Sequence, residues 1–186
     1  MPDSYQKIKQ PELVLGFVCP IGADMMPTIS SFRLYFQRRG YKVVEIKVTD
    51  VFNVLQKYFV PEAPLDKSSL YKRYVSYIAY GNQVRAKFGD STLASLAIRR
   101  IMAKRVKLTG ADEKYSKTVY LVHQFKRKEE IDILRSVYGR IFFQISIYSR
   151  RGARVDYLAR KFANSDHVTG HLKYRHLESV RDHDLF

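Results

Sequence analysis

The sequence of 186 residues contains one cysteine, Cys19, and no long apolar run. A lone cysteine cannot form an internal disulfide or supply a zinc site built from several thiolates. The apolar runs are only a few residues long, whereas a membrane helix needs about 18 apolar residues, and no signal-peptide pattern opens the sequence. These absences exclude a disulfide-stapled secreted scaffold and a self-contained Cys-ligated zinc enzyme. They predict a cytoplasmic protein without a membrane partner.

Acidic residues are also scarce. Asp and Glu number 18 against 33 Lys and Arg, which gives a formal net charge of +15. The excess is uneven, because residues 1–66 carry 8 basic and 7 acidic side chains, whereas residues 67–186 carry 25 and 11. Such a balance favours a polyanionic ligand, whether nucleic acid, nucleotide or another phosphate-bearing partner. Solubility conferred by net charge is the alternative interpretation.

The predicted strands and helices follow one another along the chain in the order typical of an α/β protein. Apolar positions make up 46% of the sequence, enough for one buried core, and neither a repeat nor a low-complexity linker interrupts them. A strand, a helix and a second strand within residues 12–48 form a βαβ unit, which implies parallel strands. We therefore predict a three-layer α/β fold with a mostly parallel central sheet and helices on both faces. Strands are expected at 12–19, 41–48, 118–122 and 140–148, and helices at 29–39, 51–60, 129–138 and 154–162, with two more over 66–107 that divide near Gly89.

The turn after the first strand is a candidate phosphate-binding loop formed by Pro20, Ile21, Gly22, Ala23 and Asp24. Unpaired amides and the dipole of a following helix converge at such a turn and attract anions. The full P-loop motif would place lysine at Ala23 and a hydroxyl residue at Asp24, so the two groups that neutralise phosphate and hold magnesium are missing. The turn therefore predicts binding rather than phosphoryl transfer. A tight turn without a ligand is the alternative.

Cationic residues follow several predicted elements close to the same edge of the sheet. Arg85 lies beside the helix break, where its guanidinium could hold a phosphate. Arg150 and Arg154 follow the fourth strand, and residues 126–128 follow the third. Ligands bind at the carboxyl edge of open α/β sheets, so these connections predict an anion-binding basin there.

A second basic surface is expected on one predicted helix. A solvated helix face is the usual explanation for such a charge run, and contact with nucleic acid is the alternative. The candidate nucleic-acid contacts are Arg99, Arg100, Lys104, Arg105, Lys126, Arg127 and Lys128.

Other patterns carry less information. Tyrosines at 71, 74, 77 and 80 recur every third residue, which indicates helix packing rather than base stacking. His167 and His171 have the i, i+4 spacing of a metal pair, but Gly170 between them argues against the helix that this pairing requires. We therefore expect no metal site, and we identify no catalytic triad or catalytic residue.

The ordered set of segments 12–24, 40–43, 81–105 and 134–151 resembles the amino-terminal P-loop-like domain of bacterial anti-phage dCTP/dCMP deaminases. The 134–151 segment is more distantly similar to deoxynucleotide monophosphate kinases. The resemblance covers roughly residues 11–163. It implies a P-loop NTPase-like nucleotide-binding domain over 1–163, followed at 164–186 by a tail or by the start of a deaminase domain.

The resemblance also implies a function. In that family a zinc deaminase domain follows and uses an H-x-E motif together with P-C-x-x-C. This chain does not carry both motifs. The resemblance therefore assigns zinc to a deaminase domain outside this chain. The implied role is a nucleotide-responsive regulatory domain, with a nucleotide, bound with or without Mg²⁺, as its ligand. Arg135 joins Arg85, Arg150 and Arg154 as an implied anion contact. A small RNA, a second copy of the chain and a deaminase domain are the implied partners, and a deoxynucleotide monophosphate kinase or an RNA/DNA-binding module are the alternative functions.

Overall fold

The fold is built on a four-stranded sheet. A computed structural model describes residues 11–109 and 117–166. Its strands are β1 (Leu13–Val18), β2 (Lys42–Lys47), β3 (Thr118–Phe125) and β4 (Phe142–Ser146), arranged in the order β2-β3-β1-β4. All three neighbouring pairs are parallel. The sheet is therefore entirely parallel, where the sequence predicts a mostly parallel one.

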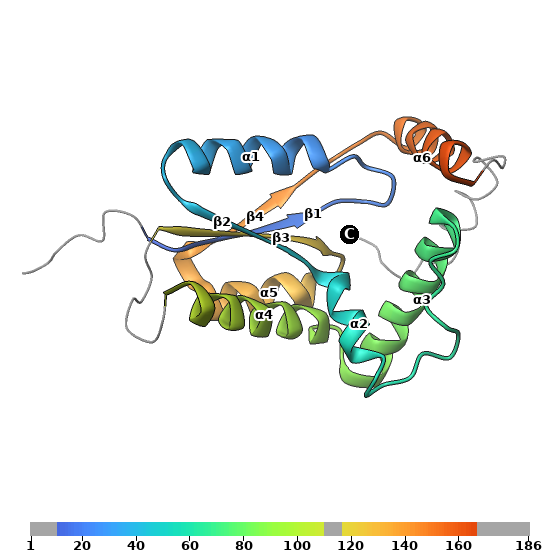
Figure 1. Cartoon of the computed structure of the whole chain (residues 1–186), viewed down its shortest axis with the longest axis horizontal. Helices are drawn as coiled ribbons and strands as arrows, with labels where there is room; N and C mark the ends of the chain where they lie inside the picture. Colours follow the sequence, from blue (N-terminus) through green and yellow to red (C-terminus); the bar gives the residue numbers. More distant parts are fainter. Residues whose placement is uncertain (1–10, 110–116, 167–186) are drawn as a thin grey trace, which may run out of the picture.

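Helices cover both faces of this sheet (Figure 1). Helix α1 (Met26–Arg38) lies on one face, and α4 (Thr92–Thr109) and α5 (Lys128–Tyr138) lie on the other. The predicted three-layer α/β architecture is confirmed. Burial on both faces explains why β1 is a nearly continuous apolar run, since both sides of a central parallel strand need apolar side chains.

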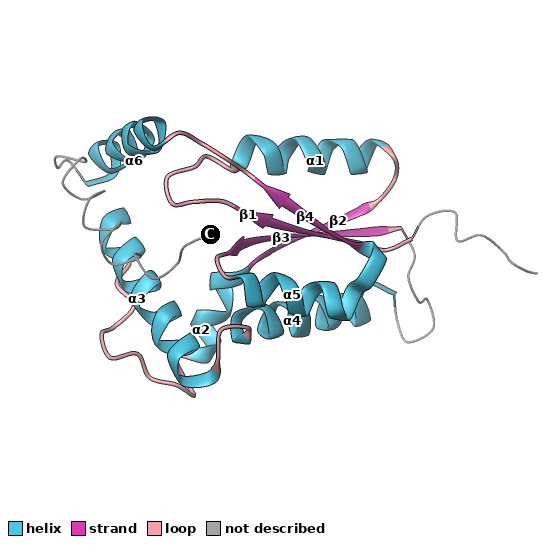
Figure 2. Cartoon of the chain, turned by 180° about the vertical axis from the view of Figure 1, so that it is seen from behind, coloured by secondary structure: helices cyan, strands magenta, loops and turns pink. Residues whose placement is uncertain are grey.

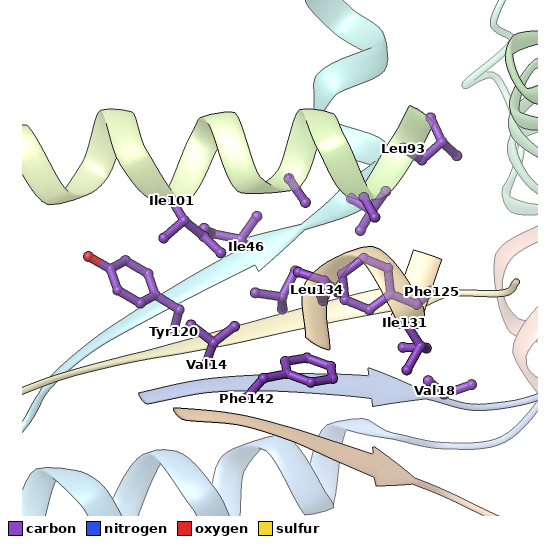
Figure 3. Packing of buried hydrophobic residues seen from close by; sticks show 14 of the residues in the cluster. Val14, Val18, Ile46, Leu93, Ile101, Tyr120, Phe125, Ile131, Leu134 and Phe142 are labelled. Carbon is purple, nitrogen blue, oxygen red and sulfur yellow. The ribbon is translucent and has the colours of Figure 1, made fainter. Parts of the chain in front are cut away.

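Alternate residues of the strands supply two cores. Val14 and Val18 of β1 face α4 and α5, where they join Tyr120, Phe125 and Leu134 (Figure 3). The intervening β1 residues, Leu15 and Phe17, pack instead with Ile29 and Phe36 of α1. This period-two division between the two faces fixes the register of β1 within the sheet.

The region between β2 and α4 differs in detail from the prediction. The expected helix over 51–60 is shorter, consisting of the 3-10 turn η1 (Val48–Val51) and α2 (Phe52–Leu55). The helix pair is confirmed as α3 (Leu70–Phe88) and α4, because Gly89 with φ of 101° ends α3. A short 3-10 turn, η2 (Gly139–Ile141), precedes β4 and trims the predicted strand.

Helices α3 and α6 (Arg151–Asp166) stand beyond the end of the sheet to which the strands point, as the views from opposite sides in Figures 1 and 2 show. The predicted packing role of the tyrosines is confirmed here. Tyr71 and Tyr74 contact the ring of Phe162 on α6, with centroids 5.9 and 5.7 Å away. Tyr77 and Tyr80 pack against Phe52. The two helices thus form a wall facing the carboxyl edge of the strands.

The far end of the chain extends beyond the described residues. Helix α6 continues to Asp166, past the boundary predicted at 163/164, whereas the rest of the 164–186 segment, with His167 and His171, lies outside the described residues. Of the helices in 11–109 and 117–166, none combines the length and hydropathy required to cross a bilayer.

Candidate phosphate-binding site

The topology creates a crevice between β1 and β3, which are neighbours in the sheet. The chain leaves β1 toward α1 on one face and leaves β3 toward α5 on the other (Figure 2). Where adjacent parallel strands send their connections to opposite faces, the loops separate and leave room for a ligand at the carboxyl edge. The 20–24 turn and Arg85, two parts of the predicted site, lie at this edge.

A cavity of about 280 Å³ opens at this position. Its walls come from the 20–24 turn, the ends of β2 and β3, and the facing sides of α3 and α6. Among the described residues that line it, Asp24 is the only one with a carboxylate. The positively charged lining residues are Lys47, Arg73, Arg85, Lys126 and Lys161. Cations therefore outnumber carboxylates among the described residues of the lining.

The 20–24 turn lies in the cavity wall but is itself closely packed. The Ala23 amide donates to the Pro20 carbonyl at 3.2 Å, and Gly22 adopts a φ of 81°, as in a type II turn. A Cβ placed on Gly22 would meet the Arg154 carbonyl oxygen at 2.8 Å and Leu158 Cδ1 at 3.1 Å. Glycine is therefore needed for the approach of α6, which is a structural reason for this residue.

Asp24 takes the place that a phosphate would occupy at the start of α1. The Met26 amide donates to Asp24 Oδ1 at 3.2 Å, so a carboxylate of the chain already sits at the positive end of the helix. The side chains of the other cavity walls are therefore the better candidates for contact with an anion.

Arg85 lines the cavity, but its charge is already used. Its Nε and Nη2 donate to Glu130 Oε1 at 3.2 and 2.9 Å, and the side chains of both residues are almost fully buried. The other carboxylate oxygen, Oε2, accepts from the amides of Lys126 and Arg127 at 2.6 and 3.0 Å. The pair joins α3 to the first turn of α5, so Arg85 binds a carboxylate of the protein where the sequence suggests a phosphate.

The other predicted anion contacts divide between the cavity and the outer surface. Lys126 lines the cavity and donates from Nζ to the Cys19 carbonyl at 2.7 Å. Arg154 lies behind the turn and donates to the Ile21 carbonyl at 3.3 Å. Arg150 is exposed after β4, and Arg135, in the last turn of α5, donates to Gln144 Oε1 at 2.6 Å. Neither Arg150 nor Arg135 is among the lining residues.

The candidate nucleic-acid contacts do not act as one group of free basic side chains. Several are engaged by carboxylates: Arg105 pairs with the buried Glu12 at 2.5 Å, Arg100 with Asp50 at 3.7 Å, Arg127 with Asp90 at 3.8 Å and Lys128 with Asp132 at 2.5 Å. Arg99 and Lys104 are exposed on α4. The basic residues that the sequence groups together therefore serve largely as ion-pair partners.

Two cations that the sequence analysis did not select, Lys47 and Arg73, line the cavity. Within the described residues, Lys47 and Arg73 have no carboxylate within ion-pair distance. Burial, and then the positive charge of Arg73, lower the pKa of Lys47. Arg73 rests over the Tyr77 ring, with its Cζ 4.8 Å from the centroid. A site that holds two like charges together, partly out of water, is prepared for an anion.

A backbone irregularity adjoins these cations. The pairing of β1 with β3 slips after Phe17, leaving Gln124 as an extra residue in β3 with a φ of 83°. Its Oε1 accepts from the Thr49 hydroxyl at 2.7 Å. A bulge with a non-glycine residue at positive φ costs about 1–3 kcal/mol, and such strain concentrates at binding sites.

The sequence contains a signal for two of the cavity residues, because both lie at the ends of strands. Lys47 and His123 are register partners at the ends of β2 and β3, so a rule selecting polar residues at the carboxyl ends of parallel strands would have found both. Arg73 and Lys161 come from α3 and α6, whose placement depends on tertiary packing, and no local pattern marks them.

Comparison with known proteins adds no identification. No protein-family model matches the sequence, and the search of curated proteins found no match. In the part of the chain that the structure describes, no group of three or more His, Cys, Asp or Glu side chains is placed to hold a metal ion. The tripeptide His176-Leu177-Glu178 has the spacing of the first zinc motif but lies outside the described ranges, and the single cysteine excludes the second motif.

Proposed function

We propose that this chain is a nucleotide-binding regulatory domain that holds a phosphorylated ligand in the cavity at the carboxyl edge of its sheet, without phosphoryl transfer. The observation that carries the proposal is the meeting of Lys47 and Arg73, which have no carboxylate partner within 11–109 and 117–166, at a cavity formed where the strand connections diverge. Charged hydrogen bonds to phosphate are among the stronger contacts that such a site can make.

The rest of the cavity suits the uncharged part of a nucleotide. Tyr74, Tyr77 and Tyr157 line it from α3 and α6, where their packed rings offer aromatic and apolar contact to a base. Gln124 and Asn82 add amide groups that can hydrogen-bond to base edges. A cationic end and an aromatic wall in one cavity fit a nucleotide better than they fit inorganic phosphate alone.

The anti-phage deaminase setting is part of the same proposal and rests on the resemblance of segments 12–24, 40–43, 81–105 and 134–151. We do not extend it to phosphotransfer, because Ala23 and Asp24 stand where a P-loop has its lysine and its magnesium-binding hydroxyl. The extensive pairing of basic residues on the outer surface gives no comparable support for RNA or DNA binding.

Isothermal titration with deoxycytidine, dCMP, dCDP and dCTP, with and without Mg²⁺, tests the proposed function. Other deoxynucleotides complete the panel. Because the cations bind phosphate, we expect heat of binding from phosphorylated compounds and none from deoxycytidine. Absence of heat with every nucleotide, or equal binding of deoxycytidine and dCMP, would contradict phosphate recognition.

A further inference from the structure

His123 is a buried polar side chain in the cavity wall that has no assigned role so far. It is 8% exposed, and its Nδ1 is buried without a hydrogen-bond partner among the described residues. Such a nitrogen is costly to bury unpaired, and native structures rarely leave one without a purpose. Its position on β3, between Phe17 of β1 and Lys47 of β2 in register, places it at the cationic end of the cavity.

The charged groups around His123 leave Lys47 as its dominant neighbour. Glu45 on β2 is held by Arg33 of α1, and Asp50 on η1 is paired with Arg100 of α4 at 3.7 Å. Burial, followed by the charge of Lys47, lowers the pKa of His123 below 6.5, while Glu45 and Asp50 oppose the shift. The imidazole is therefore neutral at pH 7 in the unliganded protein.

A bound phosphate would reverse both causes of this neutrality. It brings negative charge beside Lys47 and beside the His123 imidazole, which lines the cavity. The charged imidazolium then becomes the favoured form. Phosphate monoesters lose their second proton near pH 6, so at pH 7 they arrive as dianions able to engage Lys47, Arg73 and one further donor.

We propose that the site selects ligands with a terminal phosphate dianion and that His123 takes up one proton from solution when such a ligand binds. This inference rests on the proposed nucleotide-binding function and names its ligand class. A phosphodiester, as in a cyclic nucleotide or an internal RNA linkage, carries a single negative charge and would leave the third donor unused. The only bond formed to hydrogen is the second N–H of the His123 imidazole, and its proton comes from the buffer.

The proton can be counted by calorimetry with dCMP and dCTP in buffers of different ionisation heat. Because the complex holds one more proton than the separate partners, we expect net uptake of up to about one proton per dCMP at pH 7.5. The affinity for dCMP should correspondingly fall as pH rises from 7 to 8.5, by up to about tenfold per pH unit. A 3′,5′-cyclic nucleotide should bind more weakly than its 5′-monophosphate.

Two histidine variants test whether His123 is the group that takes up the proton. H123Q removes the titrating imidazole, and we expect it to bind dCMP without proton uptake and with a flat dependence on pH above 7. The matched control is H167Q/H171Q/H176Q/H183Q, which leaves His123 as the only imidazole of the chain. This control should retain the uptake. Its single imidazole should change from the neutral form to imidazolium in ¹⁵N NMR spectra when dCMP is added, a readout that does not depend on the folding of H123Q.

The outcomes separate this inference from the proposed function. Binding of dCMP or dCTP without proton uptake, uptake that persists in H123Q, or a neutral His123 in the dCMP complex would overturn the inference while leaving nucleotide binding intact. Failure of the wild-type protein to bind any nucleotide would overturn the proposed function, and with it the role of His123.

Discussion

Replacing Arg85 with methionine is expected to lower the free energy of unfolding by about 3–5 kcal/mol. Methionine keeps much of the side-chain volume but leaves the Glu130 carboxylate buried without its cation. An uncompensated buried charge is far more costly than a missing surface pair. Thermal or urea unfolding followed by circular dichroism measures the effect, which corresponds to a drop in Tm of roughly 6–20 °C for a chain of this size.

Arg135→Met is the matched control for this change. It also removes an arginine that pairs with a carboxylate, but the Arg135–Asp132 pair is exposed, with a 3.7 Å separation. We expect R135M to lower the free energy of unfolding by about 1 kcal/mol or less. The double variant R85M/E130Q should recover part of the stability, since a glutamine oxygen can still accept from the amides of Lys126 and Arg127. A stability of R85M equal to that of R135M would show that the buried pair is not a structural support.

Removing the unpaired cations is expected to have the largest effect on ligand binding. Charged hydrogen bonds contribute about 1.5–3 kcal/mol, so Lys47→Met and Arg73→Met should each weaken dCMP binding by about 10–100-fold. The double variant should bind at least about 100-fold more weakly. Arg99→Met is the control, because it removes one exposed positive charge outside the cavity and should leave affinity nearly unchanged.

Stability measurements on the same variants distinguish a binding role from a structural one. Lys47 is held partly out of water near Arg73, which lowers its pKa and disfavours its charged form in the unliganded protein. Lys47→Met should therefore keep or raise the Tm of the free protein while weakening dCMP binding. A variant that loses stability and affinity together, or one that binds as tightly as R99M, would contradict our assignment.

The sequence specifies the fold more fully than the site, and particular residues show why. The run from Leu13 to Val18 requires apolar cover on both faces, so its own composition places it at the centre of a parallel sheet. Gly89 likewise marks the end of α3 by a local backbone requirement. Signals of this kind act over a few residues and can be identified without the tertiary structure.

Arg85 shows where sequence reasoning stops. Its position beside a helix break is correctly predicted, but its partner Glu130 lies 45 residues away, and only tertiary packing brings α3 to the first turn of α5. A free arginine and a paired arginine look identical in sequence. The position of Lys47 at a strand end can be predicted from the sequence. That no described carboxylate pairs with it can be seen only in the structure.

The central claim is that a phosphorylated ligand occupies the cavity between the strand ends, α3 and α6. The methionines allow a direct test, because Met25 and Met26 line the cavity, whereas Met102 lies exposed on α4. In a titration of ¹³C-methyl-methionine protein with dCMP, followed by NMR with signals assigned by single Met→Leu variants, we predict shifts at Met25 and Met26 that follow saturation and an unchanged Met102. At dCMP saturation, a shift confined to Met102, or unchanged signals at Met25 and Met26, would contradict the proposed location.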